Sequence, residues 1–519
     1  MKNIYFITLF FISSIVQAQD LNILWQNTIG GDDDDRLYTM DKTTDGGFIL
    51  GGRSLSNISG DKTEDAIGNG DFWVVKVDSN GEIEWQNTIG GTFDDHLYSI
   101  NQTSDGGYIL GGISNSNISG DKTENVMGAL DYWIVKINSL GDVEWDNTVG
   151  GNGEDYLYSI EQTFDDGYYL GGYSNSNISG DKTENSMGEN DIWVVKLNEN
   201  GIVEWDNTIG GSNYDSIRSL FVTSDGGSIL GGTSGSDISG DKTENSIGLS
   251  DFWVVKLNPD GLIEWQNTIG GTESDWIESI SQTSDGGYIV GGVSESDISG
   301  DKTENSNGGF DFWVIKLDNS GTVVWQNTIG GNNIDTLKSI CETDDGGFFI
   351  AGSSTSDISG DKTENTMGGS DYWVVKLNSL GSIEGQNTIG GNNAEAAYSA
   401  VQLNDGSFLL SGFSNSDISG DKTEDSMGEY DYWILKLSAT LGLQDILKNV
   451  FNLYPNPVQE TLNIESQQQL ENVKLYNLQG QLIKEVSSNN VDVSQLSAGL
   501  YFVKVTVEGK SQTQKFIKK

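Results

Sequence analysis

A block of 60 residues repeats seven times along this chain of 519 residues. One tryptophan per block opens W-[QD]-N-T-[IV]-G-G, from Trp25 to Trp325, with Gly385 in the seventh copy. A second tryptophan lies in D-[FYI]-W-[VI]-[VIL]-K, from Trp73 to Trp433. A constant period of this length indicates a repeat architecture. The positions within the block at which the repeats begin and end then indicate which kind of repeat architecture the chain forms.

Each block contains four short runs that are rich in β-branched and aromatic residues and are separated by Gly, Asn and Asp, a pattern typical of β-strands. In the first block we expect strands at 37–43, 48–52, 72–77 and 83–88. The sequences D-G-G at 45–47 and D-S-N-G at 78–81 predict tight hairpin turns, because these residue types tolerate positive φ. The block therefore ends after the strand that contains Trp85.

Counted in this way, the seventh block lacks its fourth strand. Strands are expected at 398–403, 408–412 and 432–437, after which the repeat stops, whereas an unassigned fourth strand stands at the other end of the chain, at 21–28. An exchange of this kind joins the first and last units of a ring and leaves no free sheet edge. The sequence therefore predicts an all-β fold: a closed seven-bladed β-propeller with four-stranded blades, whose N-terminal strand completes the last blade.

The order D-G-G-Y-I-L-G-G, a long loop, and D-[FY]-W-V-V-K-L-N-x-x-G-x-I-E-W resembles the kelch repeat. In that family a glycine pair ends the second strand, and an aromatic residue and a tryptophan mark the third and fourth strands. The resemblance implies that the glycines and tryptophans serve blade packing. The block is longer than the kelch period of about 50 residues, and the excess lies in the loop between the second and third strands.

The N-terminus indicates export. Lys2, the apolar run 4–16 and the small-residue site at 16–18 predict a secretory signal peptide over 1–18, which is too short to remain as a membrane span. The mature chain is then expected to begin at Gln19, without a transmembrane segment, and to form the propeller over 19–437.

The repeat is absent from residue 452 onward. The segments N-L-Y-P-N-P-V-Q-E-T-L-N-I, V-K-L-Y-N-L-Q-G-Q-L-I-K and L-S-A-G-L-Y-F-V-K-V, followed by K-F-I-K-K, resemble the type A C-terminal sorting domain of type IX secretion substrates. The resemblance implies a small β-sandwich over 452–519 that engages the type IX secretion machinery. The protein would then be secreted or attached to the outer surface of a Gram-negative bacterium. Residues 438–451 would form a linker, either a short helix or a flexible segment.

Composition agrees with export. The formal net charge is −49; because 1–18 and 452–519 each contribute +1 and 438–451 contributes none, the propeller region carries −51. A field of this sign repels nucleic acid, which excludes that class of partner, and favours cations or basic partners. Cys341 is the single cysteine, so an internal disulfide is excluded.

Alternate connections of an antiparallel blade share one end, so the long loops lie on the same face as the connections between blades. The tips of those connections vary between copies, which suits recognition. An acid stands just before each first strand, where the chain is expected to line the central channel. We predict that these acids form a ligand-binding ring at the channel mouth: Asp35, Asp95, Asp155, Asp215, Asp275, Asp335 and Glu395.

Seven copies of I-S-G-D-K-T-E surround this ring. Closely spaced oxygen ligands suit calcium, so one hypothesis is that calcium binds the acids of the motif: Asp61, Glu64, Asp121, Glu124, Asp181, Glu184, Asp241, Glu244, Asp301, Glu304, Asp361, Glu364, Asp421 and Glu424. The alternative is a turn held by side-chain hydrogen bonds to the backbone, with Lys62 and its equivalents pairing the acids. No other cofactor is indicated.

Catalytic patterns are weaker. Seven near-copies offer no unique constellation, His96 is the single histidine, and the three arginines, Arg36, Arg53 and Arg218, form no repeated set. We therefore expect a binding or adhesion module, and not an enzyme, that recognises a glycan or a protein through the acidic long-loop face. The alternatives are a polysaccharide-active hydrolase or lyase on the same scaffold and a passive surface structural protein.

Overall fold

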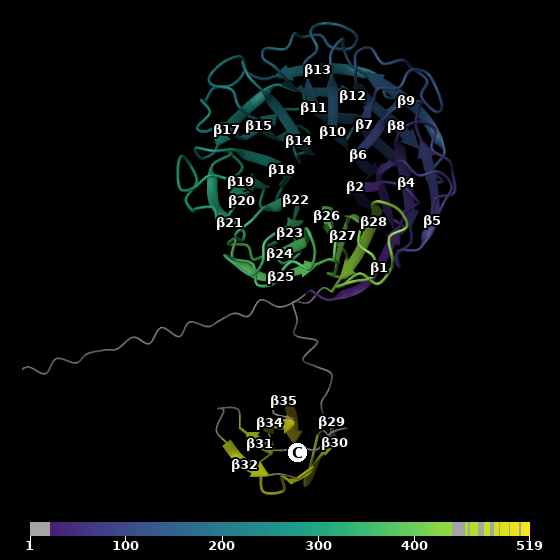
Figure 1. Cartoon of the computed structure of the whole chain (residues 1–519). Coiled ribbons are helices and arrows are strands. Elements are labelled where there is room, and N and C mark those ends of the chain that lie inside the picture. Colours follow the sequence, from purple (N-terminus) through teal and green to yellow (C-terminus); the bar gives the residue numbers. More distant parts are fainter. Residues whose placement is uncertain are drawn as a thin grey trace, which may run out of the picture. The chain divides into compact units, whose positions relative to one another are not determined.

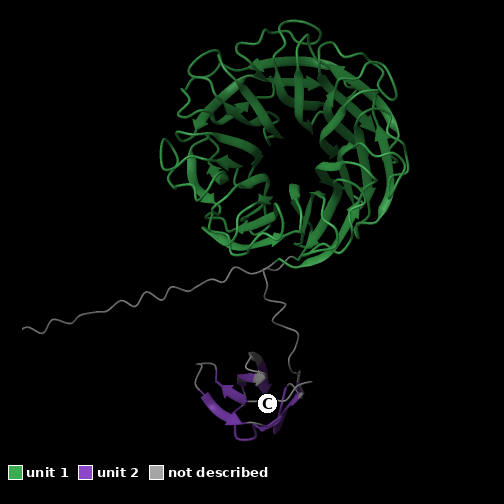
Figure 2. Ribbon diagram, in the orientation of Figure 1, with its two compact units in different colours: residues 1–441 green, residues 442–519 purple. Residues whose placement is uncertain are grey.

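The computed structural model describes residues 21–438 and, in the C-terminal part, residues 452–454, 457–465, 472–477, 482–486, 488–497, 499–507 and 510–519. The chain divides into two compact units, 1–441 and 442–519 (Figure 2). The expected signal peptide and, apart from Ser438, the expected linker lie outside the described residues. The described residues form strands, turns and loops, and no helix among them could span a membrane.

The first blade shows how the repeat folds. Its strands are β2 (Asp35–Lys42), β3 (Phe48–Ser54), β4 (Asp71–Val77) and β5 (Ile83–Ile89), and each pairs antiparallel with the next. Gly46 and Gly81 close the two short turns at φ values of 89° and 86°, which residues with a side chain rarely adopt. The four predicted strands and both predicted turns are confirmed.

The remaining blades repeat this order around a closed ring (Figure 1). Five of them consist of β6 (Asp95–Gln102), β7 (Tyr108–Ser114), β8 (Asp131–Ile137) and β9 (Val143–Val149); β10 (Asp155–Gln162), β11 (Tyr168–Ser174), β12 (Asp191–Leu197) and β13 (Val203–Ile209); β14 (Asp215–Val222), β15 (Ser228–Ser234), β16 (Asp251–Leu257) and β17 (Ile263–Ile269); β18 (Asp275–Gln282), β19 (Tyr288–Ser294), β20 (Asp311–Leu317) and β21 (Val323–Ile329); and β22 (Asp335–Glu342), β23 (Phe348–Ser354), β24 (Asp371–Leu377) and β25 (Ile383–Ile389). The seventh consists of β26 (Glu395–Gln402), β27 (Phe408–Ser414), β28 (Asp431–Leu437) and β1 (Ile23–Ile29).

The N-terminal strand closes the ring. β1 pairs antiparallel with β28, with Ile23 opposite Leu437. Beyond these strands the Ser438 amide donates to the Asn22 carbonyl oxygen at 2.8 Å. Leu21 is fully buried in a cluster that also contains Leu437. The closed seven-bladed propeller predicted from the phase of the repeat is therefore confirmed.

The tryptophans of the third strands fill the space between blades. They are the largest fully buried side chains: Trp73, Trp133, Trp193, Trp253, Trp313, Trp373 and Trp433. Trp133 of the second blade, for example, packs on Phe72 of the first with ring centroids 4.8 Å apart. Truncating one such indole to alanine would cost roughly 3–5 kcal/mol. These side chains therefore join neighbouring blades, which agrees with their expected packing role.

The tryptophans of the fourth strands cap a turn of the next blade. Trp25 covers Gly81, where a Cβ atom would lie 2.8 Å from the indole. The seventh blade has no such turn, because its fourth strand comes from the N-terminus. At this junction the Asn387 side chain of the sixth blade instead donates to the Leu21 carbonyl oxygen at 2.8 Å. Gly385 replaces the tryptophan at this junction. The one interruption of the tryptophan pattern thus coincides with the point where the chain enters the ring.

The C-terminal unit consists of two sheets around one core. One sheet contains β29 (Asn452–Tyr454), β30 (Thr461–Glu465) and β33 (Asn490–Asp492). The other contains β31 (Asn472–Tyr476), β32 (Leu482–Val486), β34 (Gly499–Val507) and β35 (Lys510–Lys518), in the order β32-β31-β34-β35. Leu462 and Val491 of the first sheet share a buried cluster with Val473, Val503 and Phe516 of the second. This two-sheet arrangement agrees with the expected small β-sandwich.

Candidate ligand-binding site

Both kinds of long connection lie at one end of the propeller. The Asp61 amide, in the loop between β3 and β4, donates at 2.8 Å to the carbonyl oxygen of Gly30, in the connection between β1 and β2. The equivalent bond recurs in each blade, as far as Asp421 and Gly390. The first strands of the blades stand nearest the ring axis (Figure 1). The predicted long-loop face is therefore confirmed.

The seven acids predicted to ring the channel mouth are fully buried. Asp35 Oδ2 accepts hydrogen bonds from the Gly31 amide at 2.6 Å and the Ser56 hydroxyl at 2.9 Å. The equivalent amide bond holds the other six acids: Asp95, Asp155, Asp215, Asp275, Asp335 and Glu395. The structure corrects the prediction of an open ring, because these side chains turn into the blade and brace the connection between blades.

The acids of the I-S-G-D-K-T-E motif also bind backbone amides. Asp61 Oδ2 accepts from the Gly30 amide at 3.3 Å, and Glu64 Oε2 accepts from the Thr88 amide at 2.7 Å. The same two bonds recur at the other candidate calcium ligands: Asp121, Glu124, Asp181, Glu184, Asp241, Glu244, Asp301, Glu304, Asp361, Glu364, Asp421 and Glu424. Over the described residues, no group of three or more His, Cys, Asp or Glu side chains could hold a metal ion. The geometry matches the hydrogen-bonded turn.

The lysine of this motif has a different role from the one expected. Lys62 is 2% exposed, and its Nζ atom donates to Thr88 Oγ1 at 2.5 Å and lies 5.3 Å above the centre of the Trp73 ring system. Burial lowers the pKa of Lys62, and the charges of Asp35 and Asp71 partly oppose this effect. The lysine therefore belongs to the polar interior of the blade and does not form the expected ion pairs with the motif acids.

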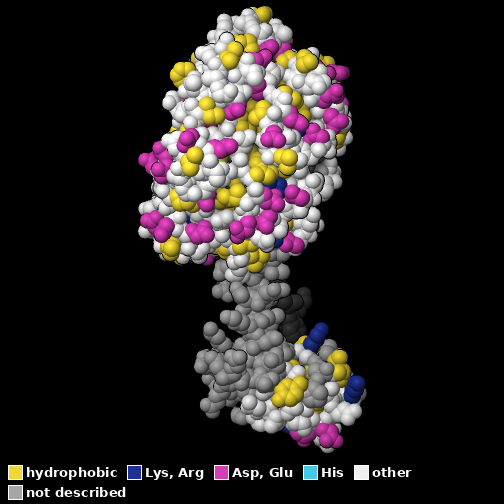
Figure 3. All heavy atoms as spheres, turned by 90° about the vertical axis from the view of Figure 1, so that its right-hand side faces the viewer, with side chains coloured by type: hydrophobic (Ala, Val, Ile, Leu, Met, Phe, Trp, Pro, Cys, Tyr) yellow, Lys and Arg dark blue, Asp and Glu magenta, His cyan; other side chains and the backbone are white. Residues whose placement is uncertain are grey.

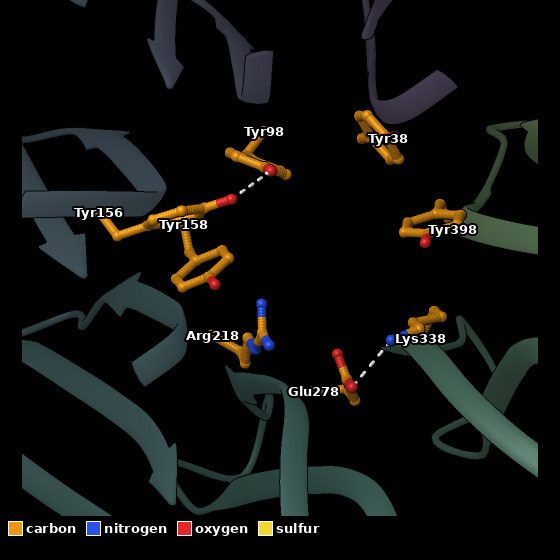
Figure 4. Close-up of a pocket in the computed structure, with 8 residues that line it drawn as sticks. All are labelled: Tyr38, Tyr98, Tyr156, Tyr158, Arg218, Glu278, Lys338 and Tyr398. Carbon is orange, nitrogen blue, oxygen red and sulfur yellow. Dashed lines mark hydrogen bonds and ion pairs between the residues drawn. The ribbon is translucent and has the colours of Figure 1, made fainter. Parts of the chain in front are cut away.

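The first strands enclose a cavity of about 450 Å³ on the ring axis (Figure 4). Seven of its eight lining residues come three positions after the buried acid of their blade: Tyr38, Tyr98, Tyr158, Arg218, Glu278, Lys338 and Tyr398; Tyr156 is the eighth. The seven blades share one backbone frame, but four of them place a tyrosine here and three consecutive blades place a charged residue. The cavity has the volume of a small-molecule site, and its two sides differ in chemistry.

The tyrosines form a continuous aromatic arc on one side of the cavity. The ring of Tyr38 lies 5.6 Å from that of Tyr98 and 5.2 Å from that of Tyr398, measured between centroids. The hydroxyl groups of Tyr98 and Tyr156 are hydrogen-bonded at 2.7 Å. Burial raises the pKa of Tyr38 to about 12 and also raises the pKa values of Tyr98 and Tyr158. The phenols are therefore neutral near pH 7 and offer both donors and acceptors.

The charged side of the cavity consists of three side chains. Lys338 Nζ lies 2.8 Å from Glu278 Oε1. The Arg218 guanidinium carbon lies 4.1 Å from the centroid of the Tyr158 ring. Arg218 is the one exposed side chain among the eight that line the cavity, and Figure 4 shows its guanidinium directed into the open centre.

A second cavity, of about 330 Å³, adjoins the first, because Arg218 and Glu278 line both. Trp276 lies on its wall with 42% of its surface exposed, and the indole Nε1 donates to the Ser250 hydroxyl at 2.9 Å. Trp276 directly follows the first-strand acid Asp275, so this cavity opens at the end of the channel that carries the long loops.

Two highly variable positions of the repeat lie at the same end. In the first strand of each blade, the residue after the buried acid lies opposite a residue of the second strand, as Arg36 lies opposite Arg53. We name these two positions in every blade the mouth positions. The first holds Arg36, His96, Tyr156, Ser216, Trp276, Thr336 and Ala396, and the second holds Arg53, Ile113, Tyr173, Thr233, Val293, Ser353 and Phe413. Each position therefore carries seven different residues in seven blades.

These residues include chemistry that is rare in the chain. The single histidine and two of the three arginines occupy mouth positions, and the third arginine, Arg218, lines the axial cavity. The sequence predicts the correct face of the propeller but not these residues. The signal that could have identified them is that each of the two positions differs in all seven copies of the block, as few other positions do.

Residues 452–519 match the family described as the secretion system C-terminal sorting domain. These residues therefore form a type IX secretion sorting domain. The protein is secreted or displayed at the surface of a Gram-negative bacterium, as the C-terminal motifs predict.

Similarity outside this domain is distant. Regulatory protein FlaEY of Caulobacter vibrioides is 24% identical over 180 residues, which are 34% of this chain and 18% of that protein; the match thus spans less than a fifth of the curated relative. Among solved structures, the WD40 domain of Neurospora crassa Pan2 has 10% identity and a TM-score of 0.40, over 79% of this chain and 95% of that one. Sqt1 from Chaetomium thermophilum has 10% identity and a TM-score of 0.38, over 82% and 100%. The kelch type of the repeat stays a resemblance.

Proposed function

We propose that this secreted propeller is a glycan-binding protein that holds a saccharide unit in the axial cavity and its long-loop mouth. The observation that supports this most directly is where the blades differ. The frame residues repeat, whereas each mouth position carries seven different residues and the cavity lining changes from tyrosine to charged residues around the ring. A passive structural protein has no need for such an asymmetric cavity.

The shape of the site favours a saccharide over a protein surface. Its residues are recessed on the ring axis, in a cavity of about 450 Å³, whereas a stable protein partner buries about 800 Å² on each side. On the outer edge of the ring, which Figure 3 shows, acidic side chains are dispersed with few basic ones among them. Tyrosine ring faces can pack against sugar C–H groups, and the phenol hydroxyls can bond sugar hydroxyls.

The lining also favours binding without hydrolysis. Glycoside hydrolysis commonly uses two carboxyl groups about 5–10 Å apart. Glu278 is the single acid that lines either cavity, and its carboxylate is already in an ion pair with Lys338 at 2.8 Å. The protein is therefore proposed as a binding module and not as a hydrolase.

The proposal is tested with the mature full-length protein on a glycan array, followed by titration calorimetry with each saccharide that binds. Tyr38→Ala removes the ring that joins Tyr98 to Tyr398 and should weaken binding about tenfold or more, as loss of an aromatic contact worth 1.4 kcal/mol would. Phe164→Ala is the matched control, because this ring lies in a turn of the opposite face with 75% of its surface exposed. The affinity of Phe164→Ala for the saccharide should equal that of the wild type.

Melting temperatures of both variants separate a lost contact from a lost fold. The proposal fails if no saccharide binds, or if folded Tyr38→Ala binds as tightly as Phe164→Ala. Release of shorter or unsaturated products from a bound polysaccharide would instead support the hydrolase or lyase alternative.

A further inference from the structure

Arg218 differs from the other cations of the channel in lacking a carboxylate partner. Within the described part of the chain, no carboxylate lies within ion-pair distance of its guanidinium, which rests on the Tyr158 ring. The other three cations of the channel and its mouth are each paired at 2.8 Å: Arg36 with Asp34, Arg53 with Asp94, and Lys338 with Glu278. The donors of Arg218 are therefore directed at the cavity and not at the protein.

The environment of Arg218 fixes the direction of these donors. The guanidinium carbon lies 4.1 Å from the centroid of the Tyr158 ring, a contact that restricts a guanidinium without using its N–H edges. Arg218 also lines both the axial cavity and the adjoining one. A ligand that occupies either cavity must therefore contact or cover this group.

The charge of the lining decides which ligands are favoured there. The cavity lining contains two cations, Arg218 and Lys338, and one acid, Glu278. The net charge of the lining is therefore +1, whereas the net charge of the propeller region is −51. A neutral ligand that covered Arg218 would remove water from a charged group without replacing all of its hydrogen bonds, which is unfavourable. An anionic oxygen group would replace them with charge-assisted bonds.

We propose that Arg218 is the anion-recognition residue of the channel and that the bound saccharide is acidic, with a carboxylate or sulfate group on the Arg218 guanidinium. This inference rests on the proposed glycan binding and names the class of glycan. Both anions can accept two parallel N–H bonds from the planar guanidinium. The tyrosine arc packs against the sugar that carries the anion, and the cavity beside Trp276 accommodates the neighbouring sugar unit.

Titration calorimetry on the mature full-length protein tests the inference with two matched pairs of probes. The first pair is an oligogalacturonide and its fully methyl-esterified form, and the second is a sulfated oligosaccharide and its desulfated form. We expect the acidic member of at least one pair to bind about tenfold or more tightly than its neutral partner, the effect of a charge-assisted hydrogen bond. The pair that shows the difference identifies carboxylate or sulfate.

Two variants of Arg218 assign the preference to this side chain. Arg218→Gln should bind the acidic and the neutral member of a pair equally, and Arg218→Lys, which retains the charge without the fork, should keep part of the preference. The matched control is Lys42→Gln, which removes a positive charge from an exposed side chain at the far end of β2. It should leave both affinities unchanged, and melting curves establish that each variant is folded.

The outcomes distinguish this inference from the proposed function. Equal binding of acidic and neutral probes by the wild type, or a preference that survives in Arg218→Gln, overturns the anion subsite and leaves glycan binding intact. Failure of all four probes, together with a glycan array that shows no binding, overturns both. If Arg218→Gln does not fold, Arg218→Lys carries the comparison, and an unchanged preference in that variant counts against the guanidinium fork.

Discussion

Buried acids at the junctions between blades predict that the propeller loses stability as the pH rises from about 4 to about 7. At the junction of the fifth and sixth blades, Asp311 of β20 and Asp335 of β22 are both fully buried. The Asn307 amide donates to Asp311 Oδ2 at 2.5 Å, and the Gly331 amide donates to Asp335 Oδ2 at 2.6 Å. The Oδ1 atom of each acid has no hydrogen-bond partner. We therefore expect the Asp311 carboxyl group to hold its proton to a higher pH in the folded state than in the unfolded chain.

The size of the effect follows from the pKa of Asp311. Burial above all, with the charge of Asp335 adding to it, raises this pKa to about 7, from about 3.9 in an unfolded chain. Because the folded state binds the proton more tightly, the stability linked to this group is fully present below about pH 4 and is lost as the pH rises through 7. A difference of about 3 pH units corresponds to about 4 kcal/mol.

The variant Asp311→Asn isolates this contribution. Its side-chain oxygen can still accept from the Asn307 amide, and its NH₂ group supplies a donor toward Asp335 at any pH. We expect the melting temperature of Asp311→Asn, relative to that of the wild type, to be higher at pH 8.5 than at pH 5 by a few degrees, on the order of 5 °C. Differential scanning calorimetry at the two pH values measures the difference.

The matched control is Asp297→Asn, an exposed position at which the first three blades already carry Asn. This substitution removes the same formal charge outside the junction, so its melting temperature should follow that of the wild type at both pH values. A constant difference between Asp311→Asn and the wild type from pH 5 to 8.5 would refute the retained proton.

Three further predictions concern the ring itself. Thr28→Pro removes an amide that donates to Glu424 Oε2 at 2.7 Å in the closing blade, and thermal melting should show a loss of about 3 kcal/mol or more; an unchanged midpoint would contradict closure by β1. Gly141→Ala places a Cβ atom 2.7 Å from the Trp85 ring at a φ of 90°, so urea unfolding should show a free energy of unfolding lower by about 1–3 kcal/mol. An unchanged free energy of unfolding would exclude the close approach. EDTA should leave the melting temperature unchanged because the motif acids bind backbone amides, whereas a fall of several degrees would reveal a structural cation.

The fold could be predicted from the sequence because repetition reveals the strand boundaries and the phase of the ends reveals the closure. The site could be predicted less well, and Asp35 shows the reason. Successive residues of a strand point to opposite sides, so Asp35 shares its side with Leu37, which is fully buried. Arg36 and Tyr38 point the other way, and Tyr38 lines the cavity. The place of a residue just before a first strand therefore shows at which end of the channel it lies. Its alternation with the buried apolar residues of the strand decides whether its side chain points into the channel.

The acids of the I-S-G-D-K-T-E motif show a related limit of reasoning from residue types. A run of closely spaced oxygen donors is compatible with a metal site and with a turn that satisfies its own backbone, and residue types alone do not separate the two. The structure separates them through partners that are distant in sequence: Glu64 binds the Thr88 amide, and Asp61 binds the Gly30 amide. Contacts across 24 and 31 residues depend on how the loop folds back over the blade, which the motif by itself does not specify.

The blades carry two kinds of position, and exposure does not explain the difference between them. Ile58 and its six equivalents are each about 60% exposed, yet all seven are isoleucine. Trp276 is 42% exposed, and no two blades agree at its position. If the copies had diverged only where the fold tolerates change, both exposed positions would differ between blades. Variation at the mouth positions and in the cavity lining instead coincides with the surface that a ligand on the ring axis would contact in all seven blades. The identity of the frame reflects the shared requirements of packing and closure, and the differences around the axis are those that the proposed asymmetric ligand would require.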